Sequence, residues 1–238
     1  MESANANLHR TCDFASRALA GNRRWRRYSM SIPLFIRSAA TRLEGLWFDA
    51  TRHVQTSSPV SLHQLTLVGA EKIGGDYLPT RPTVARQILA LLPIQNHSEY
   101  TFIDLGSGKG RMLLIAAEYP FRKVQGLEIA LELHREAKQN ISRYHHPSQR
   151  CAIIESINLD ALDYVFPDGN LILYLFNPFL PEVLKKVLAN LESSLAQHPR
   201  HVMVIIVNPV FGFVIEEKPF LRLYLETRRF RIYQSANT

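Results

Sequence analysis

Short apolar runs alternate with helical patterns along the C-terminal two thirds of this chain, which is typical of an α/β protein. The predicted strands are Tyr100–Ile103, Lys123–Glu128, Cys151–Glu155, Leu171–Phe176, Val202–Val207, Leu221–Glu226 and Phe230–Gln234. The predicted helices, with apolar positions three and four apart, are Ser31–Phe48, 82–92, 111–119, Leu131–Tyr144 and Glu182–Gln197. The last two strands alternate apolar and polar residues, which predicts a closing antiparallel pair. We therefore expect a doubly wound, mostly parallel seven-stranded sheet with an N-terminal helical extension.

A glycine-rich turn follows the first of these strands. The strand ends in a carboxylate, Asp104, and glycines follow at alternate positions, Gly106, Gly108 and Gly110, before a helical pattern starts at Arg111. A strand, a tight turn and a helix form the unit that brings a nucleotide-like ligand against bare backbone. Glycine suits such a turn because a Cβ would block positive φ angles and close approach.

Spacing separates the ligand classes that use such a turn. A phosphate-binding P-loop needs an earlier glycine where Ile103 stands, and it needs Ser or Thr after Gly-Lys, whereas here Gly110 follows Lys109. A dinucleotide fingerprint needs its third glycine where Arg111 stands. The pattern Asp-x-Gly-x-Gly-x-Gly instead resembles motif I of the class I, seven-strand S-adenosylmethionine-dependent methyltransferases.

This resemblance covers roughly 75–234 and implies a cofactor, S-adenosylmethionine, and the strand order 3-2-1-4-5-7-6. It implies that Asp104 neutralises the ammonium group of the cofactor, directly or through a water in the turn. The turn from Gly106 through Ser107 and Gly108 to Gly110 would let the backbone approach the ligand. An ordinary structural turn is the alternative explanation of the glycines.

Two further acids follow in the order that the resemblance requires. Glu128 ends the second predicted strand, 24 residues after Asp104, which is close to the separation at which such folds place a carboxylate on the ribose hydroxyls. A solvated acid at a strand end is the alternative. By resemblance, Asp160 after the third strand accepts a hydrogen bond from the adenine amino group. Asp163 is near, and either acid could instead be a helix cap.

The fourth strand runs into Asn177-Pro178-Phe179. This element resembles the Asn/Asp-Pro-Pro-aromatic motif of amine-directed methyltransferases, with one proline missing. An amine nucleophile needs an acceptor that holds its hydrogens and aims its lone pair, and an aromatic face tolerates a cationic centre. We therefore expect Asn177 and Phe179 to border the methyl acceptor. A turn that only ends the strand is the alternative.

A second element, Tyr77-Leu-Pro-Thr80, precedes the glycine-rich turn. It resembles the segment of the seven-strand protein-lysine methyltransferases that covers the methionine end of the cofactor. The resemblance places Tyr77 beside the reacting groups and Thr80 on the cofactor. A proline-ordered entry to a helix, with Pro82 in its first turn, explains the same residues without a ligand.

Charge and composition concern mainly the N-terminal part. Residues 1–52 carry nine Lys and Arg against four Asp and Glu, so most of the net charge of +7 lies there, notably in 23–27. We divide the chain into a basic tail, 1–30, for which disorder is left open, a helical extension and cofactor lid, 31–95, and a cofactor-binding domain, 96–238. The basic cluster could bind an acidic partner, whether nucleic acid, anionic lipid or an acidic protein, or it could be a solvated tail. The extension carries an apolar stripe, formed by Phe35, Ala39, Leu43, Leu46 and Trp47, that we expect to pack on the core or cover the cofactor.

The remaining features exclude several classes. No apolar run approaches the ~18 residues of a membrane span, and the histidines show no metal-ligand spacing, so we expect no membrane insertion and no metal site. The two cysteines, Cys12 and Cys151, are far apart, which favours a reducing compartment, and we expect a cytoplasmic protein. The arginine-rich, acid-poor N-terminus leaves a transit peptide open.

The sequence thus predicts an S-adenosylmethionine-dependent methyltransferase that acts on nitrogen, with an amine or a protein lysine as acceptor. One alternative is a non-catalytic S-adenosylmethionine-binding sensor or scaffold. The other is an NAD-linked oxidoreductase, which Arg111 and the Asn177-Pro178-Phe179 turn disfavour.

Overall fold

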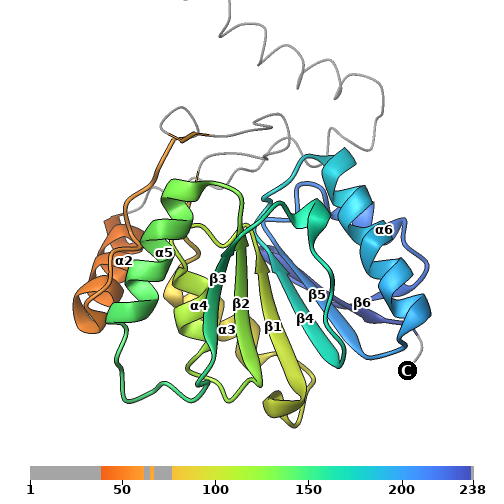
Figure 1. Cartoon of the computed structure of the whole chain (residues 1–238), viewed down its shortest axis with the longest axis horizontal. Helices are drawn as coiled ribbons and strands as arrows, with labels where there is room; N and C mark the ends of the chain where they lie inside the picture. Colours follow the sequence, from red (N-terminus) through yellow and green to blue (C-terminus); the bar gives the residue numbers. More distant parts are fainter. Residues whose placement is uncertain (1–38, 62–64, 67–76, 237–238) are drawn as a thin grey trace, which may run out of the picture. The chain divides into compact units, whose positions relative to one another are not determined.

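The computed structural model describes residues 39–61, 65–66 and 77–236, which belong to one unit of the chain (Figure 1). The helices are α2 (Ala39–Arg52), α3 (Pro82–Ala90), η5 (His97–Glu99), α4 (Arg111–Ala116), α5 (Leu131–Arg143), η6 (Ala161–Asp163), α6 (Pro181–Gln197) and α7 (Gly212–Glu216). The strands are β1 (Tyr100–Leu105), β2 (Lys123–Glu128), β3 (Ile154–Asn158), β4 (Asn170–Leu175), β5 (Val202–Val207), β6 (Leu221–Glu226) and β7 (Phe230–Ser235). The basic tail 1–30 and the start of the predicted helix Ser31–Phe48 lie outside the described residues.

The seven strands form one sheet in the order β3-β2-β1-β4-β5-β7-β6, so the predicted fold and strand order are confirmed. The first five strands of this order are parallel, and β7 runs antiparallel to both β5 and β6. The carboxyl ends of β1, β2, β4 and β5 therefore lie along one edge, where loops from several strands converge. In Figure 1, α2 and α5 lie to the left of the central strands, and α6 lies over the right-hand part of the sheet, where β5 and β6 are labelled.

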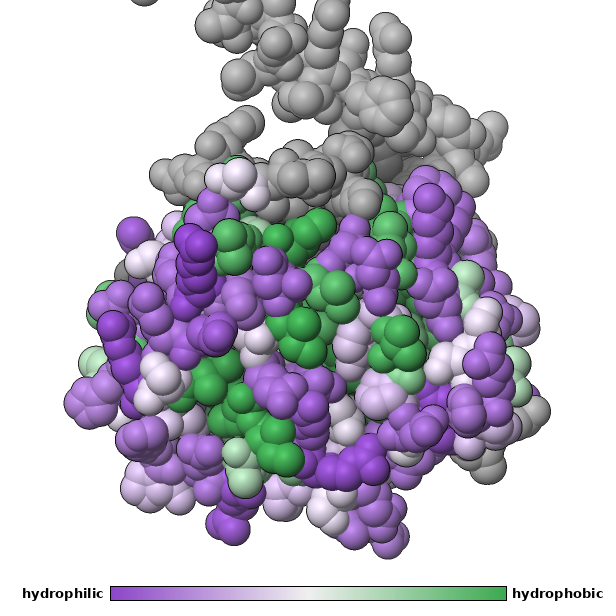
Figure 2. Space-filling model, viewed as in Figure 1, coloured by the Kyte–Doolittle hydropathy of each residue, from purple (hydrophilic) through white to green (hydrophobic). Residues whose placement is uncertain are grey.

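The central strands are buried on both faces, which explains their continuous apolar runs. Phe102 and Tyr174 belong to the core cluster shared with α2, α3 and α4, and Ile103 and Leu173 belong to the cluster shared with α6 and α7. The face shown in Figure 2 is mainly hydrophilic and carries separate hydrophobic patches. No helix in the described part of the chain combines the length and apolar character needed to cross a membrane.

Two predicted boundaries are wrong for a common reason. The third strand begins at Ile154 and not at Cys151, and α4 ends at Ala116 and not near Tyr119. The backbone N–H of Cys151 donates to the Ala117 carbonyl, at 3.1 Å, and is therefore used to close the end of α4 before the ladder with β2 starts. The short helix α7 and the turn η6 were not predicted, because segments of five and three residues carry too little periodicity.

Helix α2 presents Leu43, Leu46 and Trp47 of the apolar stripe outward, so the expectation that the stripe packs on the core is wrong for these three residues. The exposed members are Leu43, Leu46 and Trp47, with 57–65% of their surface accessible. The inward side carries Phe48, which is fully buried, and Arg52, which pairs with Glu118 at 2.8 Å. Polar partners on the core therefore hold the charged side of this helix inward, which an amphipathic pattern alone does not predict.

This orientation gives a direct test of α2. Phe48→Ala should lower the free energy of unfolding by about 3–5 kcal/mol, because it leaves a cavity in the core. Leu46→Ala, two positions away on the exposed side, should change it by no more than about 0.5 kcal/mol. Urea unfolding of both variants measures the difference. Similar losses for the two variants would contradict the orientation of the helix.

Candidate functional site

The turn between β1 and α4 consists of glycines held in the left-handed region. Their φ angles are +84° at Gly106, +54° at Gly108 and +83° at Gly110, values that side chains rarely allow. The backbone N–H groups of Gly106 and Ser107 both donate to the Leu127 carbonyl, at 2.9 Å. The turn is thus fixed to the end of β2, and the Ser107 Oγ is buried without a hydrogen-bond partner among the described residues.

The same glycines are in contact with two other predicted site elements. A Cβ at Gly106 would lie 2.5 Å from the Pro178 Cβ, and a Cβ at Gly108 would lie 2.1 Å from Cε2 of Tyr77. The structure therefore brings Tyr77 and Pro178 onto the glycine-rich turn, although they are separated by 101 positions in the sequence. The glycines are required by this packing of the protein itself, in addition to any ligand that approaches the backbone.

Two buried carboxylates flank the turn. Glu128 accepts hydrogen bonds from the backbone N–H of Gly108, at 2.7 Å, and of Ala130, at 2.8 Å. Burial raises the pKa of Glu128, although these backbone donors act in the opposite direction. Asp104 is buried, and this burial together with the charge of Glu128 raises the pKa of its carboxyl well above the ordinary value. A cation beside Asp104 would compensate for the burial of its carboxylate and for the nearby charge of Glu128.

Tyr77 and Thr80 are anchored to different parts of the fold. The Tyr77 hydroxyl donates to the Thr56 carbonyl at 3.0 Å, and its ring lies over the glycine-rich turn. Burial raises the pKa of Tyr77, so it stays a neutral phenol. Thr80 is joined through its hydroxyl to the Tyr174 hydroxyl on β4, at 2.5 Å. Tyr77 therefore covers the turn, and Thr80 ties the same segment to the sheet.

Several residues that hold this site together were not singled out from the sequence. Arg111 is buried and donates to the Thr56 hydroxyl, at 2.7 Å, and to the Ser57 hydroxyl, at 2.6 Å. Asp49 accepts from the backbone N–H groups of the same two residues, at 2.8 and 2.7 Å. Arg111 thus fixes the segment after α2 to the first residue of α4. Arg111 and the two hydroxyl groups lie more than 50 positions apart, so no local sequence signal could identify this contact.

The acid predicted for adenine lies just beyond β3. Asp160 is the cap of η6, where its Oδ1 accepts from the Leu162 N–H at 3.0 Å. The last residue of β3, Asn158, pairs in register with Glu128 and donates to its carbonyl at 2.8 Å. Asp160 therefore lies at the same edge of the sheet as Glu128, and it has the capping role that the sequence left open.

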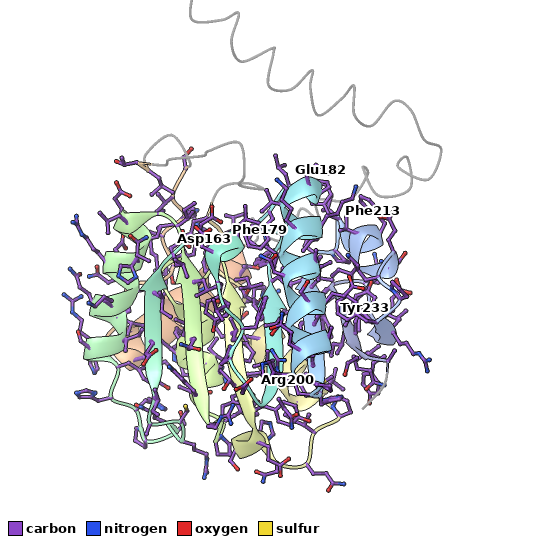
Figure 3. The ribbon with its side chains drawn as sticks, turned by 45° about the vertical axis from the view of Figure 1, so that its right-hand side comes forward. Asp163, Phe179, Glu182, Arg200, Phe213 and Tyr233 are labelled. Carbon is purple, nitrogen blue, oxygen red and sulfur yellow. The ribbon has the colours of Figure 1, made fainter. Side chains whose placement is uncertain are left out.

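Asn177, Pro178 and Phe179 follow β4 at this edge. Asn177 has a left-handed backbone, with φ +45°, and its amide Nδ2 donates to the Asn208 carbonyl after β5. The Asn177 Oδ1 is buried without a partner among the described residues. Phe179 lines a crevice with Leu184 and other apolar side chains, and Figure 3 shows it near the start of α6 and far from Arg200. The contact of Pro178 with Gly106 places this element directly beside the glycine-rich turn.

The described residues contain no group of three or more His, Cys, Asp and Glu side chains that could hold a metal ion. The polar groups of the site are instead the two carboxylates, the turn amides and the Asn177 amide. This set can bind an organic cation with hydroxyl groups and can orient a hydrogen-bond donor beside it.

Solved structures share this fold. A predicted N6-adenine-specific DNA methylase from Listeria monocytogenes is 16% identical, with 70% of this chain and 57% of that chain covered and a TM-score of 0.50. An RNA methyltransferase from Salinibacter ruber, in complex with S-adenosyl-L-homocysteine, is 20% identical, with 66% and 92% covered and a TM-score of 0.44. A ribosomal protein L11 methylase from Lactobacillus delbrueckii subsp. bulgaricus is 16% identical, with 66% and 77% covered and a TM-score of 0.45.

At these identities the likeness shows the fold alone, and this chain spans little more than half the length of the Listeria structure. No protein-family model and no curated protein sequence matches the chain. The chain has the seven-stranded, Rossmann-like fold of S-adenosylmethionine-dependent methyltransferases.

Proposed function

We propose that this protein transfers the methyl group of S-adenosylmethionine to an amine nitrogen. The observation that carries the proposal is the contact between Gly106 and Pro178. It joins a turn suited to the cofactor, with the buried Asp104 beside it, to an amide oxygen suited to an amine, the Oδ1 of Asn177. A cofactor site and an acceptor site that meet at one contact satisfy the first requirement of group transfer, the proximity of the reacting atoms.

The residues of the turn fit this cofactor. Asp104 would bind the ammonium group, which compensates for the burial of its carboxylate. Ser107 has a buried hydroxyl without a described partner, and Gly106 is exposed on the same turn, whereas Gly108 and Gly110 are buried. When bound, S-adenosylmethionine supplies an electrophilic methyl group on a positively charged sulfur.

The rest of the cofactor would lie along the edge of the sheet. Glu128 would accept from the ribose hydroxyls with the lone pairs that the backbone donors leave available. Asp160 would accept from the adenine amino group, while Tyr77 and Thr80 would cover the methionine end. In this arrangement 31–95 acts as an extension and lid of the methyltransferase domain 96–238, and the basic segment 1–30 offers a surface for an acidic partner.

The acceptor site favours a neutral amine. Its crevice is lined by Asn177 and otherwise by uncharged side chains, among them Leu175, Phe179 and Phe211. Burial against such walls lowers the pKa of an amine and so favours the free base, which is the nucleophilic form. Asn177 would accept an N–H of this amine and aim its lone pair. The acceptor is a lysine side chain or a small-molecule amine, since both combine an apolar stem with a terminal nitrogen.

Two measurements test the proposal. Calorimetry should show binding of S-adenosylmethionine and S-adenosylhomocysteine and no binding of NAD. Incubation with methyl-labelled S-adenosylmethionine and a cell lysate should then transfer label to protein or to small amines. Binding without transfer would indicate a sensor or scaffold, and binding of NAD alone would indicate an oxidoreductase.

The role of Glu128 yields a prediction of its own. Glu128→Gln should weaken S-adenosylmethionine at least about tenfold, because charge-assisted hydrogen bonds contribute roughly 1.5–3 kcal/mol each. The amide also places a donor against the N–H of Gly108 or of Ala130 and loosens the turn. Calorimetry of the folded variant measures the affinity, and Glu155→Gln on the neighbouring strand β3 is the control. Wild-type affinity in Glu128→Gln would leave Glu128 only a structural role.

A further inference from the structure

We propose that Asn208 is a positioning residue for methyl transfer: its left-handed turn presents a backbone carbonyl that fixes the Asn177 amide with Oδ1 toward the acceptor. This inference rests on the proposed function. It adds the turn after β5 to the acceptor site, which the sequence patterns had confined to the turn after β4.

The two turns match each other. Asn177-Pro178 follows β4 and Asn208-Pro209 follows β5, and these strands are parallel neighbours with Leu175 opposite Ile206. The φ angles are +45° at Asn177 and +49° at Asn208. Among the described non-glycine residues only His53 shares this sign, so two of three such positions meet here. Ending a strand does not require this conformation, which is sterically costly for residues other than Gly, Asn and Asp.

The hydrogen bond between the turns fixes which way the Asn177 amide points. The Asn208 carbonyl can only accept, so the amide nitrogen of Asn177 must face it and the Oδ1 must face away. That oxygen is buried without a partner among the described residues. A buried acceptor left without a donor is costly, and an incoming N–H would remove the cost. The geometry therefore favours an acceptor molecule that brings a hydrogen-bond donor, which the N–H of an amine supplies.

Hydrogen bonds and a neighbouring ion pair fix the turn after β5 in place. The Asn208 N–H donates to the Arg229 carbonyl at 2.7 Å, and its own carbonyl also accepts from the Val210 N–H at 2.7 Å. The neighbouring Arg231 is buried and pairs with Glu216 of α7 at 2.7 Å. The antiparallel pair β5–β7 and α7 thus fix the carbonyl that orients Asn177. A rigid support of this kind is needed because small displacements of an orienting group cost much of the rate.

Both turns also contribute walls to the same crevice. Phe179 comes from the first turn and Phe211 from the second, and Asn177 supplies the single polar side chain of the lining. The crevice is closed in this structure, so a neutral amine would reach the Asn177 oxygen only if the aromatic side chains of Phe179 and Phe211 move apart. The turn after β5 is therefore part of acceptor recognition and not only a connection to α7.

The test compares two substitutions of Asn208. Asn208→Val disfavours the left-handed backbone because its side chain is β-branched, and so displaces the carbonyl. Asn208→Gly is the conservative variant, because glycine adopts this conformation freely and keeps the carbonyl. Methyl transfer from tritiated S-adenosylmethionine is measured with poly-L-lysine and with adenosine as amine probes. Cofactor affinity is measured by calorimetry, and the Asn177 side-chain amide is followed by NMR.

Asn208→Val should lower kcat at least about tenfold, with cofactor affinity unchanged within about twofold, and Asn208→Gly should restore the rate. The Asn177 amide protons should shift and exchange faster in the valine variant and resemble the wild type in the glycine variant. Equal rates in the two variants, or a parallel loss of cofactor affinity, would overturn the inference. If the valine variant does not fold, Asn208→Ala takes its place. If the wild type methylates neither probe, the NMR comparison decides: an unchanged amide in the valine variant refutes the positioning role, whichever function the protein has.

Discussion

Asp104→Asn is expected to raise the melting temperature of the cofactor-free protein and, in the same protein, to weaken S-adenosylmethionine at least about tenfold. The two effects have one cause. The carboxylate of Asp104 is buried and lies near the charge of Glu128, so its ionised form is costly until a cation binds. Asparagine has the same shape without the charge, which removes the cost and also the attraction for the ammonium group.

The pH dependence follows from the direction of the pKa shift. Because the pKa of Asp104 is raised in the folded protein, the folded chain binds more protons than the unfolded chain above the ordinary aspartate pKa of about 3.9. Its contribution to stability is therefore present below that value and is lost as the pH rises through the raised pKa. The ammonium group binds the ionised form, so cofactor affinity should increase with pH over the same window. Asp104→Asn should show neither dependence.

Thermal unfolding and calorimetry across this pH range provide the measurements. Asp168→Asn is the matched control, since Asp168 is an exposed acid just before β4 starts, at the opposite end of that strand from the site. An asparagine variant that keeps both its affinity and its pH dependence would show that Asp104 does not bind the cofactor. A variant that loses affinity without gaining stability would instead place the loss in the geometry of the turn.

The predictable parts of this protein are those in which sequence neighbours determine structure. The turn from Asp104 to Gly110 could be predicted because its strand, glycines and helix are contiguous, and each glycine has the left-handed φ that only its residue type takes easily. The central strands could be predicted because burial on both faces requires continuous apolar runs. The strand order came only with the family resemblance, since periodicity says nothing about which strands are neighbours.

The parts that could not be predicted depend on partners distant in the chain. The outward face of α2 follows from ion pairs such as that of Arg52 with Glu118, 66 positions away. The burial of Arg111 follows from hydroxyls 54 and 55 positions earlier. The sequence did not single out Asn208, because Asn-Pro after a strand is a common turn pair. Its contact with the Asn177 amide is known only once β4 and β5 are paired.

The largest effect on rate is expected at Asn177. Asn177→Ala should lower turnover by about 10²-fold while cofactor affinity stays within about twofold, since it removes an acceptor that acts on the nucleophile. Phe179→Ala should mainly raise the KM for the acceptor, because it removes one wall of the crevice. Single-turnover methyl transfer and calorimetry, performed on the same preparations, separate the two effects.

Asn177→Asp sharpens the comparison because it keeps the size of the side chain. Aspartate cannot donate to the Asn208 carbonyl, so two oxygens would face each other and the side chain would turn away. The variant should therefore be as slow as Asn177→Ala, although it retains an oxygen that could accept from an amine. If the aspartate variant instead kept the wild-type rate, any acceptor oxygen at this position would suffice and the orientation set by Asn208 would be irrelevant. If alanine reduced cofactor affinity and turnover in equal proportion, the turn would serve the cofactor or the fold, and an amine acceptor would no longer follow from it.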